Sequence, residues 1–211
     1  MAINPAQLVG ALTNTMSAAA PERMAAEAYL LAHQQTSGFC SLLLQMIMSR
    51  GQIGGDVQLA AAVQFKNAVR RWWTRHTPMS HGIEVVGSAS AAGGGAAAQG
   101  SKLYEITAAE KAEIRRHLVD ACVSNPARST QAVLIEAVGT ISRSGYPAAW
   151  PEVLTQIHGH LRNEQGDMVR MVAAASCLRM LAKQFELSRG DRRAAVDVLA
   201  TQICPVMLQM A

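Results

Sequence analysis

The chain has 211 residues, half of them hydrophobic, so it can bury a sizeable core and is not a disordered protein over most of its length. Aromatic residues make up only 4%, helix formers such as Ala, Leu and Glu are abundant, and strand-like alternation is absent, which predicts an all-α fold. The formal net charge of +4 is too small to indicate nucleic-acid binding by itself.

The first fifty residues predict three helices with short connections. Asn4 is expected to cap the first helix, Pro21 opens the second, and a break at residues 36–38 leads to a short, very apolar third. The expected buried stripes are Leu8, Leu12 and Met16 in the first helix and Met24, Ala28 and Leu31 in the second.

Residues 56–76 predict a long fourth helix with a basic polar side. Its apolar stripe consists of Ala61, Phe65, Val69, Trp72 and Trp73. Lys66, Arg70 and Arg71 lie outside that stripe, and no acidic residue interrupts them. Three interpretations stay open: a solvated helix face with the Trp side chains in the core, a binding face for an acidic protein surface, and, least favoured, an RNA or DNA site.

Residues 77–106 are expected to form a disordered insertion rich in Gly, Ala and Ser. The run GAAAQGSK at 95–102 superficially resembles a phosphate-binding loop, but its last two residues are in the order Ser-Lys. No strand and helix flank the run to direct backbone amides at a phosphate. It is therefore interpreted as a linker.

Five further helices are predicted from residue 107 to residue 210. Thr107 should cap the first of them with Glu110 in capping-box spacing, and Gly145 is expected to end the second in a left-handed conformation. The expected buried residues are Ile114, Leu118 and Cys122; Leu134, Val138 and Ile141; Leu154, Ile157 and Leu161; Met171, Ala175, Leu178, Ala182 and Phe185; and Val196, Leu199, Ile203 and Val206.

Helix pairs recur about every 40 residues, the period of HEAT and armadillo repeats. We therefore expect a right-handed α-solenoid of HEAT-type helix pairs, about four and a half repeats long. Residues 1–76 would form repeats 1 and 2, residues 77–106 the insertion, and residues 107–211 repeats 3 to 5. The last helix lacks a capping repeat, so we expect the fifth repeat to be incomplete and the solenoid truncated at its C-terminus.

No residue pattern nominates an enzyme. The cysteines Cys40, Cys122, Cys177 and Cys204 lie far apart in apolar helical segments and are expected to be reduced core residues. His158 and His160 are two residues apart, a spacing that separates them around a helix and disfavours a metal site. We expect no catalysis, metal or cofactor, and no signal peptide or membrane span.

Several segments resemble the amino-terminal domain of the importin-beta (karyopherin) family. The most specific are QFKNAVRRWW at 64–73 and YPAAWPEVL at 146–154, which are similar to the family's alkaline-Asn helix ending in Trp and to its Tyr-Pro-x-x-Trp-Pro corner. The resemblance covers nearly the whole chain apart from residues around 77–101. It is closest to the importin-seven and importin-eight class.

The resemblance implies a nuclear transport receptor that binds the small GTPase Ran in its GTP form and carries protein cargo through the nuclear pore. Such a receptor contacts phenylalanine-glycine nucleoporins on its outer A-helix wall and shuttles between cytoplasm and nucleus, with no membrane span and no direct nucleic-acid contact expected. The implied GTPase contacts are Lys66, Asn67 and Arg70 on the second B helix and Arg23 and Glu27 on the preceding one. The implied structural residues are Tyr146, Pro147, Trp150, Pro151 and Trp73.

Two other functions remain open. A HEAT-repeat scaffold or adaptor without GTPase binding is the main alternative, and selective binding of Ran-GTP over Ran-GDP separates it from a transport receptor. An RNA-binding α-solenoid is a weaker hypothesis, which predicts an affinity that falls steeply with salt.

Overall fold

The computed structural model describes residues 3–49, 51–74, 104–162 and 167–185, together with residues 197, 200 and 201. These residues contain eight α-helices and no strand, which confirms the all-α prediction. The helices are α1 (Pro5–Asn14), α2 (Ala20–His33), α3 (Phe39–Met48), α4 (Gly55–Trp72), α5 (Ala108–Ser124), α6 (Arg128–Gly145), α7 (Val153–Leu161) and α8 (Met168–Phe185). Apart from the three isolated residues, the ninth predicted helix lies outside the described residues.

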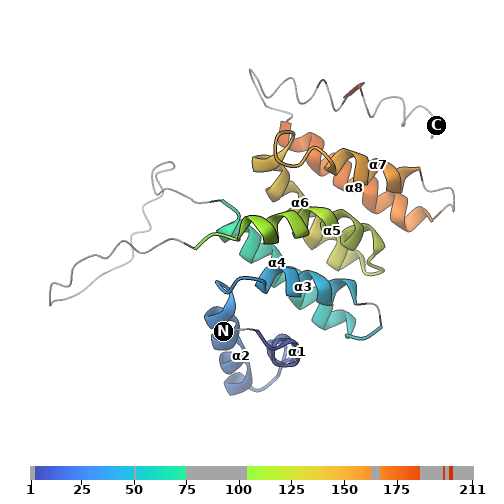
Figure 1. Cartoon of the computed structure of the whole chain (residues 1–211). Helices are drawn as coiled ribbons and strands as arrows, with labels where there is room; N and C mark the ends of the chain where they lie inside the picture. Colours follow the sequence, from blue (N-terminus) through green and yellow to red (C-terminus); the bar gives the residue numbers. More distant parts are fainter. Residues whose placement is uncertain are drawn as a thin grey trace, which may run out of the picture.

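The helices stack as antiparallel pairs in two layers (Figure 1). One layer consists of α3, α5 and α7, and the other consists of α4, α6 and α8, each helix packing on the next in its own layer. Each amphipathic helix thus buries its apolar stripe against its partner and its neighbours, as a solenoid requires. The first pair joins this stack chiefly through α1, which packs on both α2 and α4.

Local sequence signals set several helix ends as predicted. The Asn4 side chain accepts hydrogen bonds from the backbone N–H groups of Ala6 and Gln7 and so caps α1. Asn125 accepts one from the N–H of Ala127 just before α6. Gly145 instead remains helical, and the chain leaves α6 at Tyr146 with φ of −84°, so the predicted left-handed cap is wrong.

The predicted buried stripes are confirmed in α1, α4, α5, α6 and α7, except for Trp72 in the α4 stripe, which is only partly buried, and Met16 in the first stripe. Met16 lies beyond the end of α1 and is 49% exposed. Among the confirmed residues, those with no exposed surface are Leu8, Leu12, Ala61, Phe65, Val69, Ile114, Leu118, Cys122, Leu134, Val138 and Ile141.

The stripes predicted for α2 and α8 are largely wrong. In α2, Met24 and Leu31 are 70% and 65% exposed, and Ala26 and Leu30 face the core instead. In α8, Leu178 is buried as predicted, but Ala175 and Ala182 are exposed and the other core residues are Ala173, Ala174, Cys177 and Leu181. Both helices are Ala-rich, so two faces satisfy the helical period, and periodicity alone does not say which one meets a neighbour.

Glu110 connects α5 to α3 across two helix pairs. Thr107 accepts a hydrogen bond from the Glu110 N–H at 3.3 Å, as in a capping box. The carboxylate, however, accepts hydrogen bonds from the N–H groups of Gly38, Cys40 and Ser41 at 2.9–3.1 Å. A buried carboxylate thereby satisfies the free N–H groups at the start of α3 and complements the positive end of its dipole.

The chain returns to the core at residue 104, earlier than the predicted insertion boundary of 106. Ile106 is 2% exposed, and its N–H donates to the Trp72 carbonyl at 3.0 Å. Tyr104 packs edge-on against Trp72, with 5.7 Å between ring centroids. The rest of the insertion lies outside the described residues. The described chain therefore resumes, at residue 104, next to the end of α4.

The corner between α6 and α7 is built from the Tyr-Pro-x-x-Trp-Pro segment. Trp150 is fully buried and Tyr146 nearly so, while Pro147 and Pro151 are exposed. The Tyr146–Pro147 peptide bond is cis, and the N–H groups of Ala149 and Trp150 donate to the Gly145 carbonyl. The two aromatic rings thus fill the space between the helices.

Gly139 lets α6 and α8 approach closely. A Cβ at this position would lie 2.7 Å from Cγ of Met180 and 3.1 Å from Nε2 of Gln184. We expect Gly139→Val to lower the free energy of unfolding by about 1–3 kcal/mol through overpacking, as measured by urea denaturation. Gly159→Val is the control, because a Cβ there meets nothing within 4 Å and the change should stay within about 0.5 kcal/mol. Equal effects would contradict this account.

Removing the Glu110 carboxylate should destabilise the chain more than removing its neighbour. Glu110→Ala leaves three N–H groups at the start of α3 without their partner, so we expect a loss of about 2–4 kcal/mol in thermal or urea unfolding. Glu113→Ala removes only the hydrogen bond that Ser41 donates, and should cost about 1 kcal/mol. A smaller loss for Glu110→Ala than for Glu113→Ala would exclude the capping role.

Candidate protein-interaction surfaces

The predicted contact residues of α4 point in different directions. Lys66 is partly buried, and its Nζ lies 3.0 Å from Oε2 of Glu136 on α6. Asn67 and Arg70 are exposed. Because the Lys66 and Glu136 side chains are 26% and 58% exposed, their ion pair contributes little stability, but it does tie α4 to α6.

Arg23 and Glu27 lie on α2, away from this ion pair. The Arg23 guanidinium donates to the carbonyls of Ser17 and Ala18, at 2.7 and 2.9 Å, and so closes the connection between α1 and α2. Glu27 is exposed. No hydrogen bond or ion pair within the described part of the chain joins either residue to α4, so the five predicted contact residues do not form one cluster.

The α4, α6 and α8 layer carries a basic pocket of about 590 Å³. Its lining residues are Lys66, Val69, Arg70, Trp73, Thr74, Glu136, Thr140, Arg143, Ser144, Met180 and Gln184. Three of these are cationic, and Glu136 is the one carboxylate among them. Arg143 donates from Nε to Oε1 of Gln184 at 2.9 Å, which holds the guanidinium at the edge of the pocket. We call this surface the basic pocket.

Sequence reasoning found Lys66 and Arg70 but missed Arg143, Thr140 and Gln184. These residues come from helices that are far apart along the chain, and only the stacking of α6 and α8 on α4 brings them together. The available signal was a polar stripe on α6, in which Glu136, Thr140 and Arg143 follow at helical spacing.

Trp73, just past the end of α4, belongs to the core, and Trp72, the last residue of α4, is partly buried against it. Trp73 is 3% exposed, with the cationic groups of Lys111 and Arg115 at 5.6 and 5.3 Å from its ring. Burial lowers the pKa of Arg115 from its ordinary value. Burial, and secondarily the Glu110 charge, raise the pKa of Tyr104 to about 12. Trp73 therefore links the end of α4 to the first half of α5 through these two cationic side chains.

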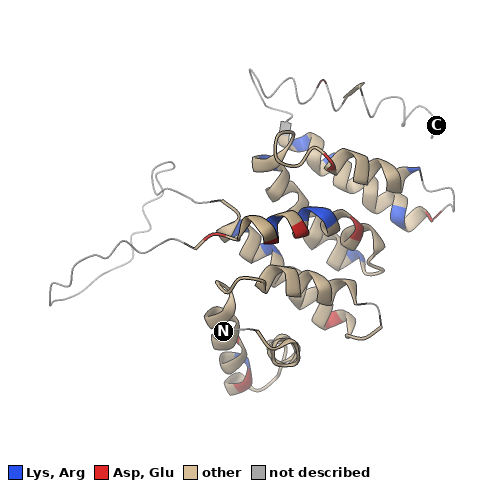
Figure 2. Ribbon diagram, in the orientation of Figure 1, with Lys and Arg blue, Asp and Glu red and all other residues tan. Residues whose placement is uncertain are grey.

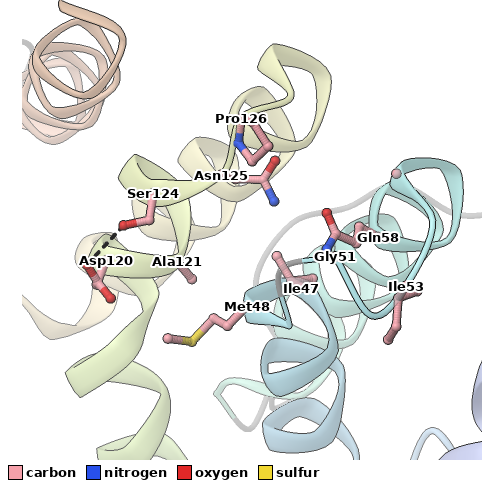
Figure 3. A pocket seen from close by; sticks show the side chains of 11 residues that line it. Ile47, Met48, Gly51, Ile53, Gln58, Asp120, Ala121, Ser124, Asn125 and Pro126 are labelled. Carbon is pink, nitrogen blue, oxygen red and sulfur yellow. Dashed lines mark hydrogen bonds between the residues drawn. The ribbon is translucent and has the colours of Figure 1, made fainter. Parts of the chain in front are cut away.

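A different pocket of about 400 Å³ lies at the edge where α3 and α5 end (Figure 3). Its apolar lining includes Ile47, Ile53, Ala121 and Pro126. Met48, which is 36% exposed, extends from α3 into the space between the two helices (Figure 3). We call this surface the edge pocket.

Charges of both signs alternate along α5 (Figure 2), whereas α4 has its one acidic residue, Asp56, in the first turn and only basic charged residues after it. Ser124 donates a hydrogen bond to Asp120, which also faces His160 of α7 with 3.7 Å between Nε2 and Oδ1. The layer formed by α3, α5 and α7 is therefore electrostatically mixed, and basic character is concentrated on the opposite layer.

The described cysteines do not form a reactive site. Cys40, Cys122 and Cys177 are buried free thiols, and the sulfurs of the last two are 3.6 Å apart. Burial raises the pKa of Cys40, and the neighbouring Cys177 thiol followed by burial raises that of Cys122, so both stay protonated. Cys204 lies outside the described residues.

Other chemistries find no support in the part of the chain that the structure describes. No group of three or more His, Cys, Asp or Glu residues there is arranged to hold a metal ion. None of the eight helices has the length and the apolar character needed to cross a bilayer.

Comparisons with known proteins identify the fold and a domain. Residues 26–124 match the family model of the importin-beta N-terminal domain. The chain is 24% identical to importin-8 of Danio rerio, and the match covers 99% of this chain and 18% of the relative. It is also 24% identical to an importin beta-like SAD2 homolog of Arabidopsis thaliana, with 90% of this chain and 15% of the relative covered. The chain thus spans less than a fifth of the length of these curated relatives.

A solved structure shares the fold. The exportin Cse1 in its cargo-free, cytoplasmic state superposes with a TM-score of 0.76 at 20% sequence identity, over 97% of this chain and 19% of that one. At this identity the likeness concerns the architecture, and it confirms the solenoid of HEAT-type helix pairs.

Proposed function

We propose that this chain belongs to the importin-beta family and acts in nuclear transport, as a receptor that carries protein cargo through the nuclear pore, because residues 26–124 match the model of the importin-beta N-terminal domain. The domain match is the observation that carries the proposal, and the likeness to importin-8 over 99% of the chain supports it. Such a receptor works through protein contacts and shuttles between cytoplasm and nucleus.

The proposed partner of the basic pocket is the GTPase Ran in its GTP form. Asn67 and Arg70 are exposed on α4, and Lys66 and Arg143 border the same pocket, so a partner there meets several cationic groups at once. Lys66 would exchange its ion pair with Glu136 for a contact with the GTPase. Arg23 and Glu27 are proposed as a separate contact on α2.

The edge pocket is a suitable site for the phenylalanine rings of phenylalanine-glycine nucleoporins. Its volume of about 400 Å³ leaves room for an aromatic ring, and Ile47, Met48 and Pro126 give it an apolar lining. The edge pocket shares no lining residue with the basic pocket. One chain could therefore hold both partners at the same time.

A binding assay with nucleotide-loaded Ran tests the GTPase contact. We expect the 211-residue chain to retain Ran bound to a non-hydrolysable GTP analogue and not Ran-GDP, and we expect Lys66→Glu with Arg70→Glu to reduce retention at least about tenfold. Arg71→Glu with Arg116→Glu is the matched control, because these Arg residues are exposed and do not line the basic pocket.

The outcomes separate the two main functions. Selective retention that is lost only in the pocket variant supports a transport receptor. Equal binding of both nucleotide forms, or no binding by a chain with native helical content, would favour a HEAT-repeat scaffold without GTPase binding.

Nucleoporin binding is tested independently of the GTPase. We expect Met48→Glu to weaken binding to immobilised phenylalanine-glycine repeats by about fivefold or more, because a carboxylate in the edge pocket opposes burial of an aromatic ring. Met24→Glu is the control, since Met24 is 70% exposed on α2, far along the chain from this pocket. The same weakening in both variants would show that binding does not involve the edge pocket.

A further inference from the structure

A second pocket lies beside the basic pocket on the same layer, between α6 and α8, and encloses about 330 Å³. Its defining residues are Arg128, Ala132 and Ile135 of α6 and Val169, Val172 and Arg179 of α8. It shares Glu136 and Met180 with the basic pocket, so the two are adjacent. We call it the α6–α8 pocket. None of the contact residues predicted from the sequence lines the α6–α8 pocket.

The floor of the α6–α8 pocket is aliphatic and open to solvent. Val169 and Val172 are 46% and 53% exposed, and Ile135 is partly buried next to them. Large aliphatic groups that line a concave surface gain free energy when a ligand covers them, at roughly 25 cal/mol for each Å² removed from water. A nucleic-acid backbone does not cover aliphatic groups well, which favours a protein ligand.

The rim of the pocket is cationic. Arg128 and Arg179 are exposed, and within the described residues neither makes an ion pair or a hydrogen bond. The one carboxylate of the lining, Glu136, is engaged by Lys66. Two free guanidinium groups beside an aliphatic floor are suited to carboxylates, which they bind through paired hydrogen bonds.

We propose that the α6–α8 pocket binds a protein segment that alternates aliphatic and acidic side chains. The aliphatic side chains occupy the space above Val169 and Val172, and the carboxylates pair with Arg128 and Arg179. The charge complementarity favours such a segment over a second copy of this chain, whose own net charge is +4. The proposal depends only on the α6–α8 pocket and not on the GTPase contact in the basic pocket.

Fluorescence anisotropy with a defined probe tests the proposal. The probe is a short fluorescein-labelled synthetic peptide of alternating Leu and Glu, titrated with the 211-residue chain. We expect saturable binding that is lost when the Glu residues are replaced by Gln and also when the Leu residues are replaced by Ser. Binding that survives the Leu replacement would reflect charge alone and would overturn the proposal.

Variants of the chain locate the site. We expect Arg128→Glu with Arg179→Glu to weaken probe binding at least about tenfold, and Val172→Asp to weaken it similarly. Arg71→Glu with Arg116→Glu makes the same change in net charge on exposed residues outside the pocket and should leave binding within about twofold. Equal weakening by the two double variants would overturn the proposal.

A gain of affinity provides a test that misfolding does not mimic. Glu136→Gln removes the only carboxylate of the lining and should strengthen probe binding about two- to fivefold. Unchanged or weaker binding by this variant would count against the proposed orientation of the acidic groups. Analytical ultracentrifugation of the chain alone shows whether it self-associates. Self-association that Val172→Asp abolishes would mean that a second copy of the chain, and not an acidic peptide segment, occupies the α6–α8 pocket, and would overturn the proposal.

Discussion

The stacking of α4, α6 and α8 is the constraint on which both pockets of this layer depend. Gly139 permits α6 and α8 to approach so closely that Met180 lies over the position where a Cβ would stand. The ion pair of Lys66 with Glu136 joins α4 to α6, and the hydrogen bond of Arg143 with Gln184 joins α6 to α8. The helix spacing therefore determines where the cationic side chains stand and how much space remains between them.

A second link holds the opposite layer in register. The Glu110 carboxylate caps the start of α3 from the first turn of α5, so the cap of one helix is supplied by another helix pair. Ile106 anchors the chain just before α5 on the end of α4. Because both contacts lie near residue 107, α5 is positioned independently of the length of the sequence that separates it from α4.

The two layers differ in chemistry as well as position. The α3, α5 and α7 layer mixes charges of both signs and carries the apolar edge pocket. The α4, α6 and α8 layer places cationic groups around one polar pocket and one aliphatic pocket that share Glu136 and Met180. Surfaces of different chemistry on one solenoid suit it to contacts with more than one protein.

The sequence alone determined the helical class, the helix pairs, the caps by Asn4 and Thr107 and most core stripes, because these follow from local periodicity and capping chemistry. It also located Lys66 and Arg70 on a basic helix face. It did not determine which face of the Ala-rich helices α2 and α8 is buried, because several faces there are equally apolar. The tertiary structure decided that choice. It also decided that Glu110 caps α3 and that Arg143 lines the same pocket as Lys66, because both depend on contacts between helices that are remote in sequence.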